Sequence, residues 1–328
     1  MNYVLSHWSA AWPVLVCYAA IVVVHLTGAR RLADADPGRE DAPTSDWAKA
    51  RRREAVVFQL GLLLAFLALV SPIAYWSGTY VWVRSVQDLM LGMVASSLVV
   101  LGAPWLALRC GLWRAAAHHL NDQAALGNGH GVASRIPRWL AWPVLITVAF
   151  NIIWLGWHVP ALYDLAARNP VARYAEIVMY LAAGVLLWFQ LIGSYPWSPP
   201  SSPLRRLALL VGTAAAGSVL GVLLVFGAGV VYPAYRGAAH DVLALVADQQ
   251  VGGAVLWTGT LPSFVIAAVA LLYTWLGDEE SGDLSAELER LTGERPGPWS
   301  APPRSGRSAG WRSGRPASPA RPRYRHTI

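Results

Sequence analysis

The chain is short of charged residues and of cysteine. Only 14% of its 328 residues are Asp, Glu, Lys or Arg, whereas a soluble domain carries about 25%. This deficit excludes an intrinsically disordered chain and disfavours an ordinary soluble enzyme. Cys17 and Cys110 are the only cysteines, too few for a disulfide framework. The sequence also shows no GxxxxGK[ST] phosphate loop and no nucleophile–base–orienter set, so we expect a protein without an enzymatic reaction of its own.

Apolar and aromatic residues dominate instead. Hydrophobic residues make up 55% of the chain, the mean hydropathy is +0.40, and there are 17 Trp and 12 Tyr residues. Trp and Tyr gather at membrane–water interfaces, and a bilayer core of about 30 Å needs about 20 mostly apolar residues per helix. We therefore predict an all-α, polytopic membrane domain over residues 1–277 with seven transmembrane helices. The predicted spans are Ala11–Gly28, Val56–Trp76, Val86–Leu108, Trp139–Trp157, Ala175–Gly193, Leu207–Val231 and Val251–Leu276.

The basic residues predict the orientation of these helices. Of the 26 Lys and Arg residues, 22 fall in the loops after the first, third and fifth spans and in the C-terminal tail. Because basic loops stay on the cytoplasmic side, we expect the N-terminus outside and the C-terminus in the cytoplasm. Residues 1–12 contain no Lys or Arg, and no cleavage site follows the first apolar run, so we expect this helix to be retained rather than removed as a signal peptide.

The C-terminal region differs in composition from the rest. Residues 278–293 combine acidic side chains with regularly spaced leucines, which predicts a short acidic amphipathic segment. Residues 294–328 are rich in Pro, Ser and Gly and carry eight arginines, which predicts a disordered cytoplasmic tail. Membrane lipids of the anionic inner leaflet are the expected partner of this basic tail. We expect no nucleic-acid partner, since basic runs are usually solvated or membrane-facing.

Several polar residues lie where apolar ones are expected, at the outer ends of the predicted spans. Ionisable residues at such positions indicate a functional site. Because they come from separate spans but share one membrane level, we predict that they form a polar extracytoplasmic vestibule. Its candidate members are Arg84, Gln87, Asp88, His158, Asp164, Arg173, Glu176, His240, Asp248 and Gln249.

Two spacings and one glycine motif allow simpler, structural interpretations. Arg84 and Asp88 are four residues apart, and Arg173 and Glu176 are three apart, so each couple could form an ion pair within one helix. Gly217 and Gly221 form a GxxxG motif on the sixth span. Such motifs allow another helix to approach closely, and we expect the contact to lie within the chain.

A series of motifs runs in order through residues 27–276. They include a basic first loop with Trp47 and Arg53, followed by FQLGLLLAFLALVSP (58–72), QDLMLGMVASSLVVLGAP (87–104), WHVPALYDLA (157–166), AEIVMYLAAGVLLW (175–188), YPAY (232–235) and DQQVGGAVLW (248–257). In order and spacing these motifs resemble the multi-pass CtaG family of bacterial cytochrome c oxidase assembly factors. The resemblance implies a location in the bacterial plasma membrane and a role in assembling the copper centre of a respiratory oxidase.

The chain departs from this family at four positions. Family members that resemble it carry one histidine pair opening the third span (H-M-x-Q-H) and another opening the fifth (H-x-x-E-H), a spacing that suits metal binding. Here the first pair reads Arg84 and Asp88, and the second reads Arg173 and Ile177. Arginine stays protonated and cannot ligate a metal, so we predict no metal or other cofactor. His158 is the one remaining weak candidate for a copper ligand.

The sequence therefore predicts a membrane assembly or interaction factor for a haem–copper cytochrome c oxidase. Its expected partners are oxidase subunits or a copper carrier, docked at the outer vestibule. Two alternatives stay open. One is a copper chaperone with a relocated site near His158. The other is a small-solute or ion transporter that uses the same charged residues, although transporters typically show internal repeats and polar sites at the bilayer midplane.

Overall fold

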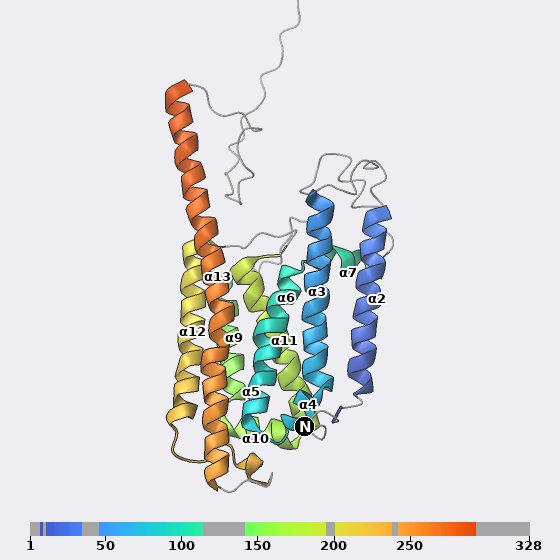
Figure 1. Ribbon diagram of the computed structural model, residues 1–328, viewed down its shortest axis with the longest axis vertical. Helices are drawn as coiled ribbons and strands as arrows, with labels where there is room; N and C mark the ends of the chain where they lie inside the picture. Colours follow the sequence, from blue (N-terminus) through green and yellow to red (C-terminus); the bar gives the residue numbers. More distant parts are fainter. Residues whose placement is uncertain are drawn as a thin grey trace, which may run out of the picture. The chain divides into compact units, whose positions relative to one another are not determined.

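Every element of the protein that can be described is a helix (Figure 1). The structure is a computed structural model that describes residues 7–8, 11–34, 46–113, 142–194, 201–237 and 242–292. This result confirms the predicted all-α fold. The α-helices are α2 (Trp12–Asp34), α3 (Asp46–Val70), α4 (Pro72–Trp76), α5 (Val81–Leu89), α6 (Ser96–Leu101), α7 (Trp105–Leu112), α9 (Pro143–Trp157), α10 (Pro160–Arg168), α11 (Pro170–Ile192), α12 (Pro203–Phe226) and α13 (Val242–Thr292), joined by the π-helix η1 (Met90–Ala95) and the 3-10 helix η3 (Pro233–Gly237).

Six helical stretches are long and apolar enough to cross a membrane. The bent pair of α9 and α10 adds a seventh if it counts as one span, although its two helices meet at 68°. The number and order of the predicted spans agree with this arrangement. The six unbroken stretches are Trp12–Leu32, Lys49–Val70, Val81–Leu101, Pro170–Ile192, Pro203–Phe226 and Ala244–Val269.

Five of the six unbroken spans begin earlier than their hydropathy predicts, including the second, at Lys49 rather than Val56, and the sixth, at Pro203 rather than Leu207. The third starts at Val81 rather than Val86, and the fifth at Pro170 rather than Ala175. The seventh likewise starts at Ala244, seven residues before its predicted first residue. The added turns of the third, fifth and seventh spans contain polar side chains that bond to groups of other helices, so their burial does not end the helix. A hydropathy pattern treats the same residues as loop.

The third span also ends earlier than predicted, at Leu101 rather than Leu108. Ala103 has a positive φ of 41°, a conformation that is rare outside glycine and ends a helix. Pro104 then follows, and its ring lacks the N–H that a continuing helix would need. Helix α7 therefore starts anew and packs against α2 (Figure 1).

The third span and α11 form the most buried part of the bundle. Tyr180, Leu187 and Trp188 of α11 are all at most 2% exposed. Helix α11 approaches the wide turns of η1 closely, because a Cβ built on Gly184 would collide with the carbonyl oxygen of Gly92. The close approach of these two backbones therefore depends on a glycine at position 184.

The C-terminal predictions lie largely outside the described residues. The chain divides into two compact units, Met1–Glu280 and Ser281–Ile328, and the bundle belongs to the first. Helix α13 covers most of the predicted acidic segment 278–293, but side chains beyond Leu276 are not described. The predicted basic tail, 294–328, is outside the described part altogether. Both segments stay predictions.

Replacing Gly184 with Ala should destabilise the bundle by about 1–3 kcal/mol, because a methyl group would overpack the contact with η1. Gly217 of α12 provides the matched control, since its Cβ would meet no atom within 4 Å. Thermal unfolding in detergent should show a lower melting temperature for G184A and none of this loss for G217A. Equal stability of the two variants would contradict the packing described for α11.

Candidate functional site

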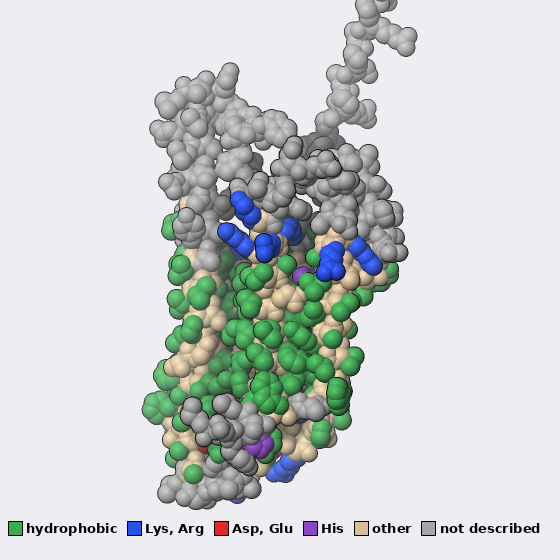
Figure 2. Space-filling view, turned by 45° about the vertical axis from the view of Figure 1, so that its right-hand side comes forward, with side chains coloured by type: hydrophobic (Ala, Val, Ile, Leu, Met, Phe, Trp, Pro, Cys, Tyr) green, Lys and Arg blue, Asp and Glu red, His purple; other side chains and the backbone are tan. Residues whose placement is uncertain are grey.

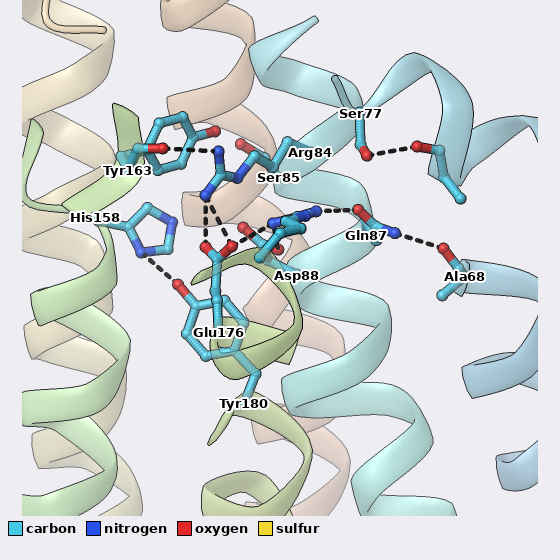
Figure 3. Close-up of polar contacts among 12 residues, drawn as sticks. Ala68, Ser77, Arg84, Ser85, Gln87, Asp88, His158, Tyr163, Glu176 and Tyr180 are labelled. Atoms are coloured by element: carbon cyan, nitrogen blue, oxygen red, sulfur yellow. Dashed lines mark hydrogen bonds and ion pairs between the residues drawn. The ribbon is translucent and has the colours of Figure 1, made fainter. Parts of the chain in front are cut away.

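The centre of the site is an ion pair between two helices. Arg84 lies in the first turn of α5 and Glu176 in the second turn of α11. The Nη2 group of Arg84 donates to both carboxylate oxygens of Glu176, at 2.7 and 2.8 Å (Figure 3). The two side chains are 1% and 0% exposed. Burying either charge alone would cost several kcal/mol, so each residue makes the burial of the other tolerable and together they tie α5 to α11.

Three tyrosines surround the Arg84 guanidinium group. Its Nη1 donates to the carbonyl oxygen of Tyr163 and to the hydroxyl of Tyr235, both at 3.1 Å. The guanidinium carbon lies 3.6 Å from the centre of the Tyr163 ring, which is a cation–π contact. Tyr232 stacks on that ring with centroids 3.9 Å apart. Burial raises the pKa of Tyr235, so its hydroxyl stays protonated and donates to the carbonyl oxygen of Ser77 at 3.0 Å.

Arg173 links this ion pair to two further helices. Its Nη1 donates to Glu176 and its Nη2 to the side-chain oxygen of Gln87. Gln87 in turn donates to the carbonyl oxygen of Ala68 in α3 at 2.6 Å (Figure 3). A continuous polar chain therefore runs from α11 through α5 to α3. Arg173 is 19% exposed.

Asp88 completes what we call the ionic cluster, which comprises Arg84, Asp88, Arg173 and Glu176. Its carboxylate is 0% exposed and lies 3.7 Å from Nη1 of Arg173. Neither oxygen of Asp88 accepts a hydrogen bond from the residues that the structure describes. The cluster therefore holds two cations and two carboxylates, and only Arg173 reaches the surface to an appreciable extent.

His158 lies beside the ionic cluster and caps the end of α9. Its Nδ1 is 2.7 Å from the carbonyl oxygen of Trp154, and since a carbonyl only accepts, Nδ1 must carry the proton. The Tyr180 hydroxyl is 3.2 Å from the same nitrogen. Nε2 is then the unprotonated nitrogen of the neutral ring, and it has no hydrogen-bond partner in the described part of the chain. The His158 side chain points toward Glu176 in Figure 3.

Asp248 of α13 fixes the start of α5. Its carboxylate accepts hydrogen bonds from the backbone N–H groups of Val81 and Trp82, at 2.8 and 3.1 Å. The first N–H groups of a helix have no partner within the helix, and a carboxylate there also interacts favourably with the helix dipole. Asp248 therefore holds the helix turn that carries Arg84.

Gln249 fixes the loop that carries two of the tyrosines. Its side-chain oxygen accepts hydrogen bonds from the N–H groups of Val231 and Tyr232, both at 2.9 Å. Its amide nitrogen donates to the carbonyl oxygen of Gly229 at 3.2 Å. Adjacent residues of α13 thus position two different parts of the site.

The remaining predicted residues have separate places. Asp164 accepts a hydrogen bond from the N–H of Ala234 at 3.2 Å and lies 3.7 Å from Arg168, so it anchors η3 rather than joining the ionic cluster. Gly221 packs against Trp257 and Gly253 of α13, whereas Gly217 faces open space. His240 lies outside the described residues.

Sequence reasoning missed the tyrosines and the pairing of Arg84. Tyr163, Tyr180, Tyr232 and Tyr235 are 0–2% exposed and border the ionic cluster. All four occur within the motifs WHVPALYDLA, AEIVMYLAAGVLLW and YPAY, and this was the available signal. Of the two ion pairs that could form within single helices, the structure contains Arg173 with Glu176, while Arg84 bonds across helices to Glu176 instead.

The donor set at this site does not suit a transition metal. Among the residues with described positions, no group of three or more His, Cys, Asp or Glu side chains is arranged to hold a metal ion. The ionic cluster contains two guanidinium groups, which cannot ligate, and its carboxylates face these cations. The Nε2 atom of His158 offers one imidazole ligand, whereas soft copper sites combine several thiolate, thioether or imidazole ligands.

The geometry thus defines a polytopic helical membrane protein with a buried polar site near one end of its bundle. The sequence model of the Caa3_CtaG family, cytochrome c oxidase caa3 assembly factors, matches residues 23–278. The chain belongs to this family.

Among curated proteins, the chain is 26% identical over 248 residues to an uncharacterized protein of Mycobacterium leprae (strain TN). That match covers 68% of this chain and 35% of the relative, so the chain spans about a third of the relative's length. No solved structure matches the chain.

Replacing Glu176 with Gln should destabilise the protein by about 3–5 kcal/mol, because two buried guanidinium groups would lose their shared carboxylate. Replacing Arg84 with Met in the same chain should recover part of this loss, since one unpaired charge is then removed. A double-mutant cycle measured by thermal unfolding in detergent checks both statements. Strictly additive losses would show that Arg84 and Glu176 are not coupled.

Proposed function

We propose that this protein assembles a haem–copper cytochrome c oxidase by docking a partner, without an enzymatic reaction of its own. Family membership supports the general role in oxidase assembly. The partner is an oxidase subunit or a copper carrier, and the docking site is the end of the bundle that contains the ionic cluster. In this proposal the protein lies in a bacterial plasma membrane and that end faces outward.

One observation carries the proposal: Arg84, Asp88 and Arg173 of the ionic cluster stand at three of the four positions where similar family members carry paired histidines. Arg84 is bonded to Glu176, Tyr163 and Tyr235 and is fully buried. A residue held in this way cannot act as a metal ligand or be displaced by one at low cost. These contacts of Arg84 therefore favour a structural and recognition role for the site over copper transfer.

Arg173 is the member of the ionic cluster best placed to meet a partner. It is 19% exposed, while Arg84, Asp88 and Glu176 are 0–1% exposed. Its guanidinium group already contacts Glu176 and Gln87. An acidic group of a partner would bind the guanidinium group of Arg173 at this rim. The buried carboxylates would hold Arg173 in position for that contact.

The orientation rests on the distribution of basic residues. Lys49, Arg52 and Arg53 lie at the start of α3, and Arg205 at the start of α12, all exposed. They occupy the end of the bundle opposite α10 and the ionic cluster (Figure 1). The tendency of basic residues to stay in the cytoplasm supports an outward-facing site.

A copper chaperone centred on His158 is the second candidate. The unpartnered Nε2 of His158 supports it, because a neutral imidazole nitrogen with its other nitrogen protonated is a competent ligand. A partner would have to supply the other ligands. Under this alternative, H158A should abolish oxidase maturation, whereas R173Q should leave it unchanged.

The test is oxidase maturation in a strain that lacks the gene. We expect the haem–copper oxidase spectrum to be lost, added copper not to restore it, and the wild-type chain to restore it. R173Q should restore it poorly, and R168Q, at an exposed arginine of the same end that pairs with Asp164, should restore it fully. Purified protein should hold well under one copper per chain by elemental analysis.

Recovery of the oxidase by copper alone, or one tightly held copper per chain, would contradict the docking proposal and favour metal supply. An oxidase spectrum unaffected by the deletion would contradict both functions.

A further inference from the structure

The basic end of the bundle contains a short helix held in a fixed place. Helix α7 lies between the ends of α3 and α2 (Figure 1). Its backbone touches α2 directly, because a Cβ on Gly28 would collide with Ala107 and a Cβ on Gly111 would collide with Val24. Arg31 donates to the carbonyl oxygens of Cys110 and Gly111 at 2.7 and 3.0 Å. These carbonyls belong to the last turn of α7, where the C=O groups have no N–H donor within the helix.

The C-terminal end of α7 and the residue that follows it carry exposed side chains. Arg109 is exposed, and Leu112 and Trp113 are 61% and 63% exposed. A basic side chain next to exposed Leu and Trp side chains is typical of a helix that lies at a membrane interface. Trp at that depth packs between headgroups and acyl chains.

Arginines of α2 and α3 lie at the same end of the bundle as α7. The side chains of His25 in α2 and Gln59 in α3 are hydrogen-bonded at 3.0 Å, and the two helices run in opposite directions. Arg31 lies six residues after His25 in α2, and Arg53 lies six residues before Gln59 in α3. A helix rises 1.5 Å per residue, so each arginine is about 9 Å from the His25–Gln59 contact along its helix axis. Arg31, Arg53 and their neighbours therefore lie at the same level of the bundle.

The exposed members form a surface that we call the basic corner: Arg30, Arg52, Arg53 and Arg109, with Trp113. Figure 2 shows Lys and Arg side chains gathered at this end, above a belt of apolar side chains. Glu54, the acidic residue nearest in sequence on α3, is paired with Arg51 at 2.9 Å. The corner is therefore cationic where the membrane-facing surface ends.

We propose that the basic corner binds the headgroup phosphate of an anionic phospholipid. Guanidinium groups bind phosphate through paired hydrogen bonds, and Leu112 and Trp113 contact the glycerol and upper acyl region of the same lipid. This site is independent of the docking proposed for the ionic cluster, which lies at the other end of the bundle. It adds a lipid requirement that the oxidase assembly role does not imply.

The test uses the full-length protein in nanodiscs that contain phosphatidylglycerol and phosphatidylcholine, followed by native mass spectrometry of the lipids retained. We expect wild-type protein to retain phosphatidylglycerol preferentially. R52Q/R109Q should weaken this retention by at least about tenfold, since each arginine near an anionic surface contributes about 1 kcal/mol. R168Q/R236Q, which removes two exposed arginines elsewhere, should retain the lipid like wild type. All three proteins should show the same melting temperature in phosphatidylcholine alone.

Equal phosphatidylglycerol retention by R52Q/R109Q and wild type would overturn the proposal, and so would an equal loss in R168Q/R236Q. Inorganic phosphate serves as the competitor. If millimolar phosphate displaced the lipid completely, the corner would be a site for soluble anions and the lipid assignment would be wrong. Failure of the lipid test with intact oxidase maturation would leave the proposed function standing.

Discussion

One carboxylate holds the site together. Glu176 receives hydrogen bonds from both Arg84 and Arg173, so it joins the start of α5 to the start of α11. Without it, two guanidinium groups would lie in a low-dielectric interior, where a lone charge costs several kcal/mol. The other polar contacts depend on this arrangement, since the tyrosines pack on Arg84 and Gln87 bonds Arg173. The site is best regarded as one balanced unit of two cations and two carboxylates.

The Arg84 side chain is fully buried and bonds to groups of α10, α11 and η3. Asp248 and Gln249 then position the helix start and the loop around it. Within the ionic cluster, Arg173 is the member with the greatest exposure, at 19%.

Hydropathy was sufficient to predict the helical fold and the order of the spans. It could not place the beginnings of the third, fifth and seventh spans, because residues such as Arg173 and Asp248 are polar by composition but held inside the bundle through bonds to other helices. It could not choose between an intrahelical partner and Glu176 for Arg84, since that choice depends on the distance between α5 and α11. The tyrosines escaped notice because an aromatic residue in a membrane protein is ordinarily assigned to the lipid interface.

The central claim is that the end of the bundle with the ionic cluster meets the partner during oxidase assembly. Photo-crosslinking in living cells tests it most directly, with a photoreactive residue at Val171 beside Arg173 or at Leu204 near the opposite end. Both positions are well exposed, at 76% and 61%. The account predicts that the probe at Val171 crosslinks to an oxidase subunit or a copper carrier and that the probe at Leu204 does not. Crosslinks from Leu204 with none from Val171 would contradict it.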